Sequence, residues 1–450
     1  MNLIYGIKDK PKFSQTIVFA IQQLLAIMAA TLVVPVIINN SVEGCELSSA
    51  AALFGAGAGT LVYILFTKAN SPVFLGSSFA FIGSMVAAFS GAITVGYLGL
   101  VLGAIFAGLV YVVIAIIIKF VGVKWIGKLM PAVVIGPTVA IIGLSLAGNA
   151  ISDLTTSNYE GGSVYVAIIC GLVTLFTTMI ASVYGKKSIK LIPFIIGILS
   201  GYIVASVFYV IGKVTGCTEL MIIDYSAVVN CFETVSIKSF IAVPDFTFVK
   251  AVKGISEITA TDVISVAVAY CPVAFVVFAE HIADHKNLSS IIGQDLLENP
   301  GLDKTLLGDG IGSMVGSLFG GCPNTTYGES VACVAITKNA SVSTIVTTAV
   351  LAIVISFLSP FVAFVNTIPS CVMGGVCVAL YGFIAVSGLK MIKNVELDDN
   401  RNLFIVSVIL ICGIGGLTVT FGKVSLTSIA CSLILGIVTN LILSRKKAED

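Results

Sequence analysis

The stretch that decides the fold is Gly320-Gly321-Cys322-Pro323-Asn324-Thr325-Thr326-Tyr327-Gly328-Glu329-Ser330. It lies within a long apolar region, yet its two Gly and its Pro interrupt a helix, because Gly is conformationally loose and Pro lacks an N–H donor. Glu329 follows the break and precedes a second apolar run. A hydrophobic segment broken by Gly and Pro, with a charge at the break, is typical of the binding site of a transporter. The alternative is a tight loop outside the membrane that carries an ordinary surface Glu.

The composition is that of a membrane protein. Hydrophobic residues make up 57% of the 450-residue chain and charged residues 10%, against about 25% charged residues in a typical soluble domain. Long continuous apolar runs, without an alternation of period two, exclude a transmembrane barrel and predict an all-α polytopic membrane protein. The net charge of +1 gives no reason to expect a nucleic-acid partner. The sequence contains no metal-ligand spacing, no nucleophile–base pair and no cofactor motif, so we expect neither an enzyme nor a bound cofactor.

Apolar runs long enough to cross a bilayer predict about fourteen transmembrane segments, each of about 20 residues. The expected segments are 14–38, 48–67, 72–90, 94–118, 129–149, 163–184, 190–212, 258–283, 304–319, 323–338, 340–358, 367–390, 402–420 and 424–444. Ser77-Ser78-Phe79-Ala80 resembles Thr325-Thr326-Tyr327-Gly328, and the stretch from Pro131 resembles the stretch from Pro369. Seven segments followed by seven more place the two halves in opposite orientations, which is an inverted repeat.

Lysine and arginine gather in loops on one side of the predicted membrane. Examples are Lys8, Lys10, Lys12, Lys186, Lys187, Lys190, Arg445, Lys446 and Lys447. The positive-inside rule therefore predicts that this side, with both termini, is the cytoplasmic side of a cell membrane. The interval 215–256 is the longest polar interval, and we expect it to face outside and to contain strands or an amphipathic helix.

Two carboxylates lie at the end of the apolar segment 258–283. Glu280 and Asp284 are four residues apart, so they share one face of a helix. Charges in a membrane helix are costly unless they are solvated or used, which favours a substrate or proton site at Glu280. For Asp284, a substrate or proton site and a helix end in water are equally favoured. His281 and His285 fit the solvated helix end better.

The residues alone thus predict a carrier with two broken helices and a carboxylate from each of two segments. The second broken helix is Ser71-Pro72-Val73-Phe74-Leu75-Gly76-Ser77-Ser78-Phe79-Ala80-Phe81, where hydroxyls could donate hydrogen bonds and aromatic rings could stack on a planar substrate. Ordinary packing of small residues is the alternative for this segment.

The motif Pro323-Asn324-Thr325-Thr326-Tyr327-Gly328-Glu329 resembles the signature of the nucleobase–ascorbate transporter family. Ala279-Glu280-His281 and the stretch from Phe74 to Phe81 are similar to the same family, most closely to its bacterial uracil permeases. The similarity runs from about Gln22 to Lys390. It implies a fourteen-helix fold with a seven-plus-seven inverted repeat and short strands in the broken segments three and ten.

The resemblance also implies how the chain is divided and what it does. A core domain would comprise 14–118 and 258–358, a gate domain 119–213 and 359–445, and an extracellular loop 214–257. The implied activity is the import of a nucleobase, with uracil favoured, by proton symport through alternating access. Family members commonly act as homodimers in the lipid membrane.

Carried over residue by residue, the resemblance assigns the substrate site. Glu280 and Glu329 would bind the edge of the base, Phe79 and Gly328 would offer backbone groups, and Tyr327 and Tyr381 would lie near the ring. Carboxylates accept hydrogen bonds from N–H groups, and backbone N–H groups donate to carbonyl oxygens. Together they match the ring N–H donors and carbonyl acceptors of uracil. Burial disfavours the charged form of a carboxyl group, so Glu280, Asp284, His285 and Glu329 are candidates for proton coupling.

Two departures from the family pattern leave the substrate open. Segment one has Gln22-Gln23 where many members have Gln-His, and Asp284, with His285 beside it, stands where uracil permeases carry His. An acidic residue there resembles purine-type members. A xanthine or other purine permease therefore stays an alternative, as does a channel or anion exchanger on the same fold.

Overall fold

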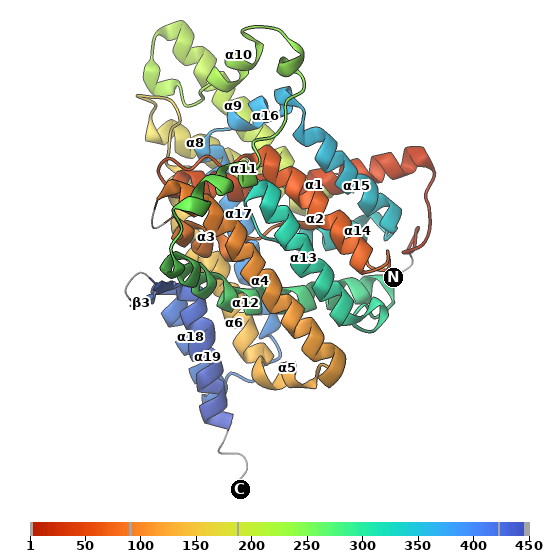
Figure 1. Cartoon of the computed structure of the whole chain (residues 1–450). Coiled ribbons are helices and arrows are strands. Elements are labelled where there is room, and N and C mark those ends of the chain that lie inside the picture. Colours follow the sequence, from red (N-terminus) through yellow and green to blue (C-terminus); the bar gives the residue numbers. More distant parts are fainter. Residues whose placement is uncertain (1–2, 90–91, 187–188, 422–423, 445–450) are drawn as a thin grey trace.

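The computed structural model describes residues 3–89, 92–186, 189–421 and 424–444, and these residues are mostly helical (Figure 1). Lys187, Arg445, Lys446 and Lys447 lie outside the described residues. Within the described ranges, eight helices are long and apolar enough to cross a membrane. They are α1 (Phe13–Ser41), α2 (Ser49–Phe66), α4 (Ile93–Val121), α6 (Ala132–Ser145) continued by α7 (Ala147–Leu154), α8 (Val164–Tyr184), α9 (Pro193–Thr215), α12 (Ala260–Ile292) and α17 (Ser370–Met391).

Shorter or less apolar elements account for the other six predicted segments. They are β1 (Leu75–Ser77) with η1 (Phe79–Phe81) and α3 (Ile82–Ala88), α13 (Leu302–Gly320), β2 (Asn324–Thr326) with α14 (Gly328–Thr337), α15 (Val342–Ser356), α18 (Asn400–Ile414) and α19 (Ser428–Ser444). Each of the fourteen predicted segments therefore coincides with a helix or a broken helix, and the chain is a multi-pass membrane protein. Between them lie the short helices α5 (Lys124–Leu129), α10 (Ser226–Phe232), α11 (Thr247–Ala251) and α16 (Ser359–Asn366).

Two expectations about local structure need correction. α12 continues to Ile292 instead of ending near 283, because its polar residues find buried partners. The segment expected at 402–420 is helical only to Ile414, and β3 (Val419–Phe421) then pairs with β4 (Val424–Leu426) in an antiparallel hairpin. The interval 215–256, for which strands or a helix were expected, forms short helices and includes a backbone bridge between Ile241 and Leu358.

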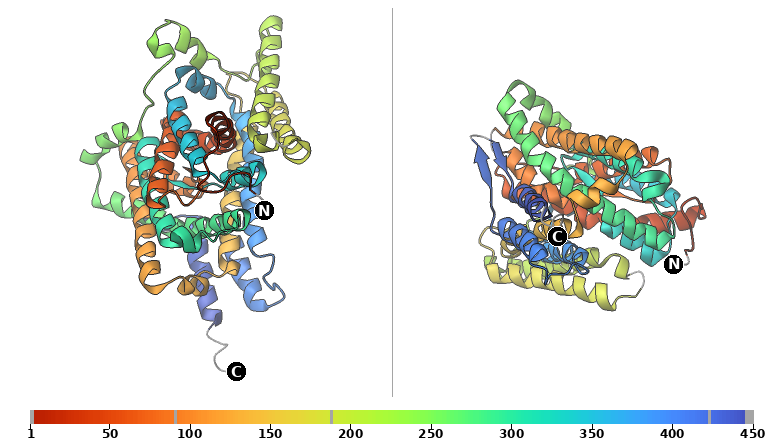
Figure 2. Two further views of the ribbon diagram at one scale, coloured as in Figure 1. Left: turned by 90° about the vertical axis from the view of Figure 1, so that its right-hand side faces the viewer. Right: turned by 90° about the horizontal axis from the view of Figure 1, so that it is seen from below.

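The spanning helices pack into two bundles. In the first, here the α2–α13 bundle, α1, α2, α4, α12, α13 and α15 pack against one another. In the second, the α6–α17 bundle, α6 packs against α17, α18 and α19, and α8 packs against α9 and α17. Figure 2 shows α4 (orange) and α8 (yellow) on opposite sides of the molecule. α9 exposes Ile203 (60%), Val207 (53%) and Val210 (59%), as expected of a helix that faces lipid.

The packing pattern has the symmetry of a seven-plus-seven repeat. α4 packs against α12, and their counterparts in the other half, α15 and α1, also pack together. In the same way, the contact between α8 and α17 has its equivalent in the contact between α18 and α6. The contact between α3 and α12 has its equivalent in the contact between α14 and α1. Pro131 and Pro369 cap the N-termini of α6 and α17, so the sequence similarity at these positions marks equivalent places. Because a repeat predicts all of these pairs at once, the contacts support the inverted repeat expected from the sequence.

The two broken segments meet through their backbones. β1 pairs with β2 in antiparallel register, with Gly76 opposite Thr325. All six strand residues are buried. Backbone without helical hydrogen bonds is tolerated at membrane depth only inside the protein or beside a cavity, and this pairing satisfies it. Gly76 is required because a Cβ there would collide with the ring of Tyr327. Gly321, at φ +74°, ends α13 and lets the chain turn into β2.

Close contact between α2 and α13 holds these strands in place. A Cβ added at Gly55 would collide with the carbonyl oxygen of Gly316, and one at Gly59 would approach that of Gly312 to 2.6 Å. The Asn324 amide donates to the Gly55 carbonyl at 3.1 Å, and the Asn324 backbone N–H donates to Ser313 Oγ at 2.9 Å. Small residues in membrane helices permit such backbone contact. β2 is therefore fixed to both helices of this pair.

We predict that Gly55→Ala lowers the free energy of unfolding by about 1–3 kcal/mol, because the obstructing atom belongs to a backbone that cannot rotate away. Thermal unfolding in detergent measures the change. Gly382→Ala is the matched control, since nothing lies within 4 Å of a Cβ at Gly382 on α17. Equal melting temperatures for the two variants would contradict the prediction.

Candidate functional site

Three carboxylates from two elements line one cavity. Glu280 and Asp284 lie one turn apart on α12, and Glu329 is the second residue of α14. The cavity has a volume of about 410 Å³ and is lined by all three, together with Gly328. Glu280, Asp284 and Glu329 are half-buried. The structure thus brings together the two Glu that the sequence placed in the substrate site, and it adds Asp284 to the same cavity wall.

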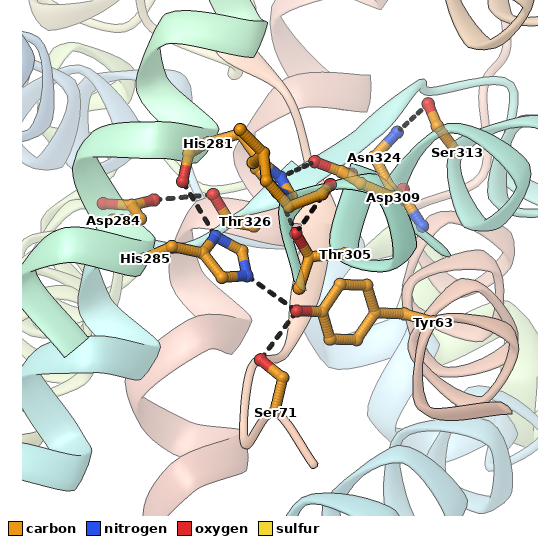
Figure 3. Close-up of polar contacts among 11 residues, drawn as sticks. Tyr63, Ser71, His281, Asp284, His285, Thr305, Asp309, Ser313, Asn324 and Thr326 are labelled. Carbon is orange, nitrogen blue, oxygen red and sulfur yellow. Dashed lines mark hydrogen bonds and ion pairs between the residues drawn. The ribbon is translucent and has the colours of Figure 1, made fainter. Parts of the chain in front are cut away.

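Asp284 is not at a solvated helix end. Its Oδ2 accepts a hydrogen bond from Thr326 Oγ1 at 2.7 Å, which links α12 to β2 (Figure 3). Its Oδ1 lies 4.0 Å from the place of a Cβ at Gly328. Asp284 therefore sits beside the start of α14, where the first N–H groups of a helix lack partners within the helix.

A second, narrower pocket of about 50 Å³ continues from this cavity. Both spaces are lined by Glu280, Gly328 and Glu329, and the narrow pocket is also lined by Phe79 and Tyr327. Gly328 begins α14 and Phe79 begins η1, so both predicted backbone donors stand at helix starts next to the pocket.

Tyr381 is the one predicted substrate-binding residue that lines neither space. Its ring contacts the ring of Phe79 edge to face, with centroids 5.9 Å apart and an interplanar angle of 75°. Its hydroxyl is buried and has no hydrogen-bond partner among the described residues. Tyr381 is therefore placed behind Phe79, one side chain away from the pocket.

A neighbouring face of α12, one residue further round the helix, carries a buried histidine pair (Figure 3). His281 and His285 are fully buried, and their rings stack with centroids 4.0 Å apart. The expectation that they belong to a solvated helix end is therefore wrong. His281 Nδ1 lies 2.6 Å from Asp309 Oδ2, and His281 Nε2 lies 3.1 Å from Thr305 Oγ1, both on α13. These contacts explain why α12 continues beyond the length that hydropathy indicated.

His285 extends this network toward α2. Its Nε2 lies 2.7 Å from the Tyr63 hydroxyl, which lies 2.7 Å from Ser71 Oγ. Its Nδ1 lies 2.8 Å from the His281 carbonyl oxygen, so Nδ1 carries a hydrogen because a carbonyl can only accept. The structure places His285 away from the cavity, because its side chain points about 100° round the helix from that of Asp284, toward α2.

Sequence reasoning missed several residues of these networks. Asp309, Thr305 and Tyr63 hold the histidines, and Gln23 donates to Ser330 Oγ at 2.5 Å, directly after Glu329. The signal for Asp309 was a lone carboxylate within the Gly-rich segment 304–319, which is costly in a membrane helix and therefore informative. Tyr63 and Thr305 carry no comparable signal, since both residue types are common in apolar helices.

Comparison with known proteins identifies relatives along the whole chain. A sequence model of a permease family, Xan_ur_permease, matches residues 14–422. The uracil permease of Bacillus subtilis (strain 168) is 35% identical over 453 residues, covering 99% of this chain and 96% of the relative. The uracil permease of Bacillus caldolyticus is 37% identical, covering 98% and 94%, and that of Escherichia coli (strain K12) is 32% identical, covering 97% and 93%.

Solved structures show the same fold at low sequence identity. The transmembrane domain of a cyanobacterial bicarbonate transporter matches with a TM-score of 0.58 and 14% identity, covering 97% of this chain and 100% of that chain. The murine solute carrier 26 family member A9, an anion transporter, matches in its inward-facing state with a TM-score of 0.58 and 12% identity, covering 98% and 69%. At these identities the likeness concerns the fold alone.

We predict that His281→Ala lowers the free energy of unfolding by about 1–3 kcal/mol, because it leaves Asp309 buried with an unmade hydrogen bond. Thermal unfolding in detergent gives the shift. Asn287→Ala is the control, because Asn287 is exposed on the same helix. An unchanged melting temperature for His281→Ala would show that the pair between α12 and α13 does not stabilise the fold.

Proposed function

Because the chain belongs to this permease family, we propose that it imports a nucleobase, most specifically uracil, by proton symport through alternating access. The single observation that carries the proposal is the pair of carboxylates, Glu280 and Glu329, at one cavity beside two helix starts. Uracil offers two ring N–H donors and two carbonyl acceptors. Carboxylates suit the donors and free backbone N–H groups suit the acceptors. The relatives named as uracil permeases support this substrate.

The three carboxylates argue against an anion as substrate, although the fold is shared with anion transporters. An anion in this cavity would face like charges, unless several of the carboxyl groups were protonated. Asp284 favours one alternative within the family, a xanthine or other purine permease. It lines the cavity, and an acidic residue at this position resembles purine-type members.

Uptake into proteoliposomes tests the proposed function. Purified protein is reconstituted, a pH gradient is imposed, and the uptake of radiolabelled uracil, xanthine and guanine is compared. We expect saturable uracil uptake that depends on the gradient. Accumulation of xanthine or guanine in place of uracil would establish the alternative, and flux without saturation would indicate a channel.

The proposal includes the division into moving parts. The α2–α13 bundle would act as the core domain (14–118 and 258–358) and the α6–α17 bundle as the gate domain (119–213 and 359–445). In the structure the cavity reaches Lys190, Ile336 and Met391, at one end of α9, α14 and α17. At the other end, Asn40 of α1 donates to Asp153 of α7 at 3.0 Å. A site that is open at one end, while the two bundles are hydrogen-bonded to each other at the other end, fits alternating access.

We further propose that the open end faces the cytoplasm. The N-terminal segment lies there, since Tyr5 pairs with Asn339 just after α14 and Lys8 Nζ donates to the carbonyls of Lys68 and Ala69 at the end of α2. Basic residues gather on the same side, which supports cytoplasmic termini in a cell membrane. Labelling of Cys217 from outside intact cells, but not of a Cys introduced at Ser290, tests this orientation. The homodimer that the family resemblance implies is tested by the mass of the purified protein in detergent.

The site assignment follows from the same proposal. Glu280 and Glu329 would bind the N–H edge of the base, with the Phe79 and Gly328 N–H groups on its carbonyls, Tyr327 beside the ring and Tyr381 supporting Phe79. Asp284 would share a proton with Glu280, since the two lie one turn apart at the same cavity. His285 would act indirectly, through the buried network that joins α12 to α13 and α2.

We predict that Glu329→Gln weakens uracil binding about 10- to 100-fold. The Gln side chain can place an NH2 donor against a ring N–H donor, and a buried hydrogen-bonding group left without a partner costs about 1–3 kcal/mol. Equilibrium binding of radiolabelled uracil to the purified variant measures the loss. Glu298→Gln, on an exposed residue before α13, is the control for removal of one charge. Normal uracil accumulation by a folded Glu329→Gln variant would remove this residue from the mechanism.

For Asp284→Asn we predict a loss of dependence on the pH gradient that exceeds the loss of uracil affinity. Glu280 and Glu329 line the same cavity, so Asp284 is placed to exchange a proton with them. Uptake with and without a gradient, and binding, are measured on one preparation. Asp398→Asn, on an exposed loop residue, is the control.

Other results for Asp284 have equally clear meanings. If affinity and gradient dependence both stay unchanged, Asp284 has no part in coupling. If only binding is lost, Asp284 belongs to the substrate site. Asp284→His moves the position toward the pattern of uracil permeases and should retain uracil uptake.

A further inference from the structure

The narrow pocket has two chemically different walls. The wall formed by α12, α14 and the two broken segments carries the polar groups Glu280, Glu329 and Thr325, beside the rings of Phe79 and Tyr327. The Thr325 hydroxyl is buried and has no partner among the described residues. The wall from the α6–α17 bundle is aliphatic. It consists of Ile142 on α6 with Leu380 and Ile384 on α17.

A pyrimidine ring has the same division. In uracil, both N–H donors flank the C2 carbonyl at one edge, and the carbon atoms C5 and C6 form part of the opposite edge. If the carboxylates accept from the N–H groups, the C5–C6 edge is directed away from them. An apolar edge binds best against apolar side chains, and Ile142, Leu380 and Ile384 supply these on the opposite wall.

The two helices that carry the aliphatic wall are packed too closely to move apart easily. α6 and α17 touch at their backbones, because a Cβ at Gly143 would collide with the Tyr381 carbonyl oxygen and one at Gly388 with the Ala140 amide nitrogen. Ile142 is itself only 2% exposed. A larger group in the pocket would therefore have to separate the two helices, and a pocket of about 50 Å³ has room for only a few water-sized groups.

We propose that Ile142 sets the size limit at the C5–C6 edge of the bound pyrimidine, and thereby excludes pyrimidines with a substituent at C5. This inference rests on the proposed function and assigns to α6 a part in substrate selection. Val139, one turn earlier, lines only the wide cavity, so the limit is specific to the side chain at 142.

Competition binding tests the inference. Wild type and variants are reconstituted, and inhibition of radiolabelled uracil binding by unlabelled uracil, thymine and 5-ethyluracil is measured. In Ile142→Ala we expect the inhibition constant of thymine relative to uracil to fall by about 10-fold or more, the effect of about one methyl group in an apolar pocket. Ile142→Val removes one carbon and should shift the ratio in the same direction by less.

Ile141→Ala is the matched control. Ile141 is fully buried one position earlier, and it faces Gly413 of α18 instead of the pocket. The same deletion there loosens the bundle without enlarging the site, so the ratio should stay at the wild-type value. An unchanged ratio in both Ile142 variants, or an equal fall in Ile141→Ala, would overturn the inference. A wild type that binds no uracil would reject the proposed function by itself, and this inference with it.

Discussion

The structure depends on the pairing of β1 with β2. A chain that leaves the helical conformation inside a membrane exposes N–H and C=O groups that lipid cannot satisfy. Here two such breaks, from distant parts of the sequence, satisfy each other, with Gly76 opposite Thr325. This pairing allows two half-helices to begin in the middle of the protein. Phe79 and Gly328 occupy those beginnings, so the feature that satisfies the backbone also places the two residues proposed as donors beside the cavity.

α12 shows how one helix can serve two purposes. Glu280 and Asp284 face the cavity, whereas His281 and His285 face α13 and α2. The four residues lie on adjacent turns, so the direction of each is fixed by the helical period. The buried contacts of the histidines tie α12 to α13 and α2. These contacts help to hold Glu280 and Asp284 in position, and Asp284 also accepts a hydrogen bond from the Thr326 hydroxyl.

Much of the fold could be predicted from the sequence, because hydropathy and helix breakers act locally. Apolar runs located all fourteen segments, and Gly320, Gly321 and Pro323 located the central break. Glu280 and Glu329 could be identified because a charge in an apolar segment is rare. The length of α12 and the burial of its histidines could not be predicted, since both depend on Asp309 and Tyr63, which reach them only in the folded state. The β3–β4 hairpin was missed because its strands are three residues long and adjoin an apolar helix.

The repeat has a consequence for how a ligand is oriented. A site built between two identical halves would be two-fold symmetric and would accept a planar ring in two equivalent poses. In this chain the cavity carboxylates belong to α12 and α14, both in the second half, whereas the equivalent broken segment of the first half presents Phe79. The pseudo-symmetry of the scaffold is therefore broken by charge at the place where the halves meet. The repeat provides the architecture, and the residues that differ between its two halves give the site a single polarity.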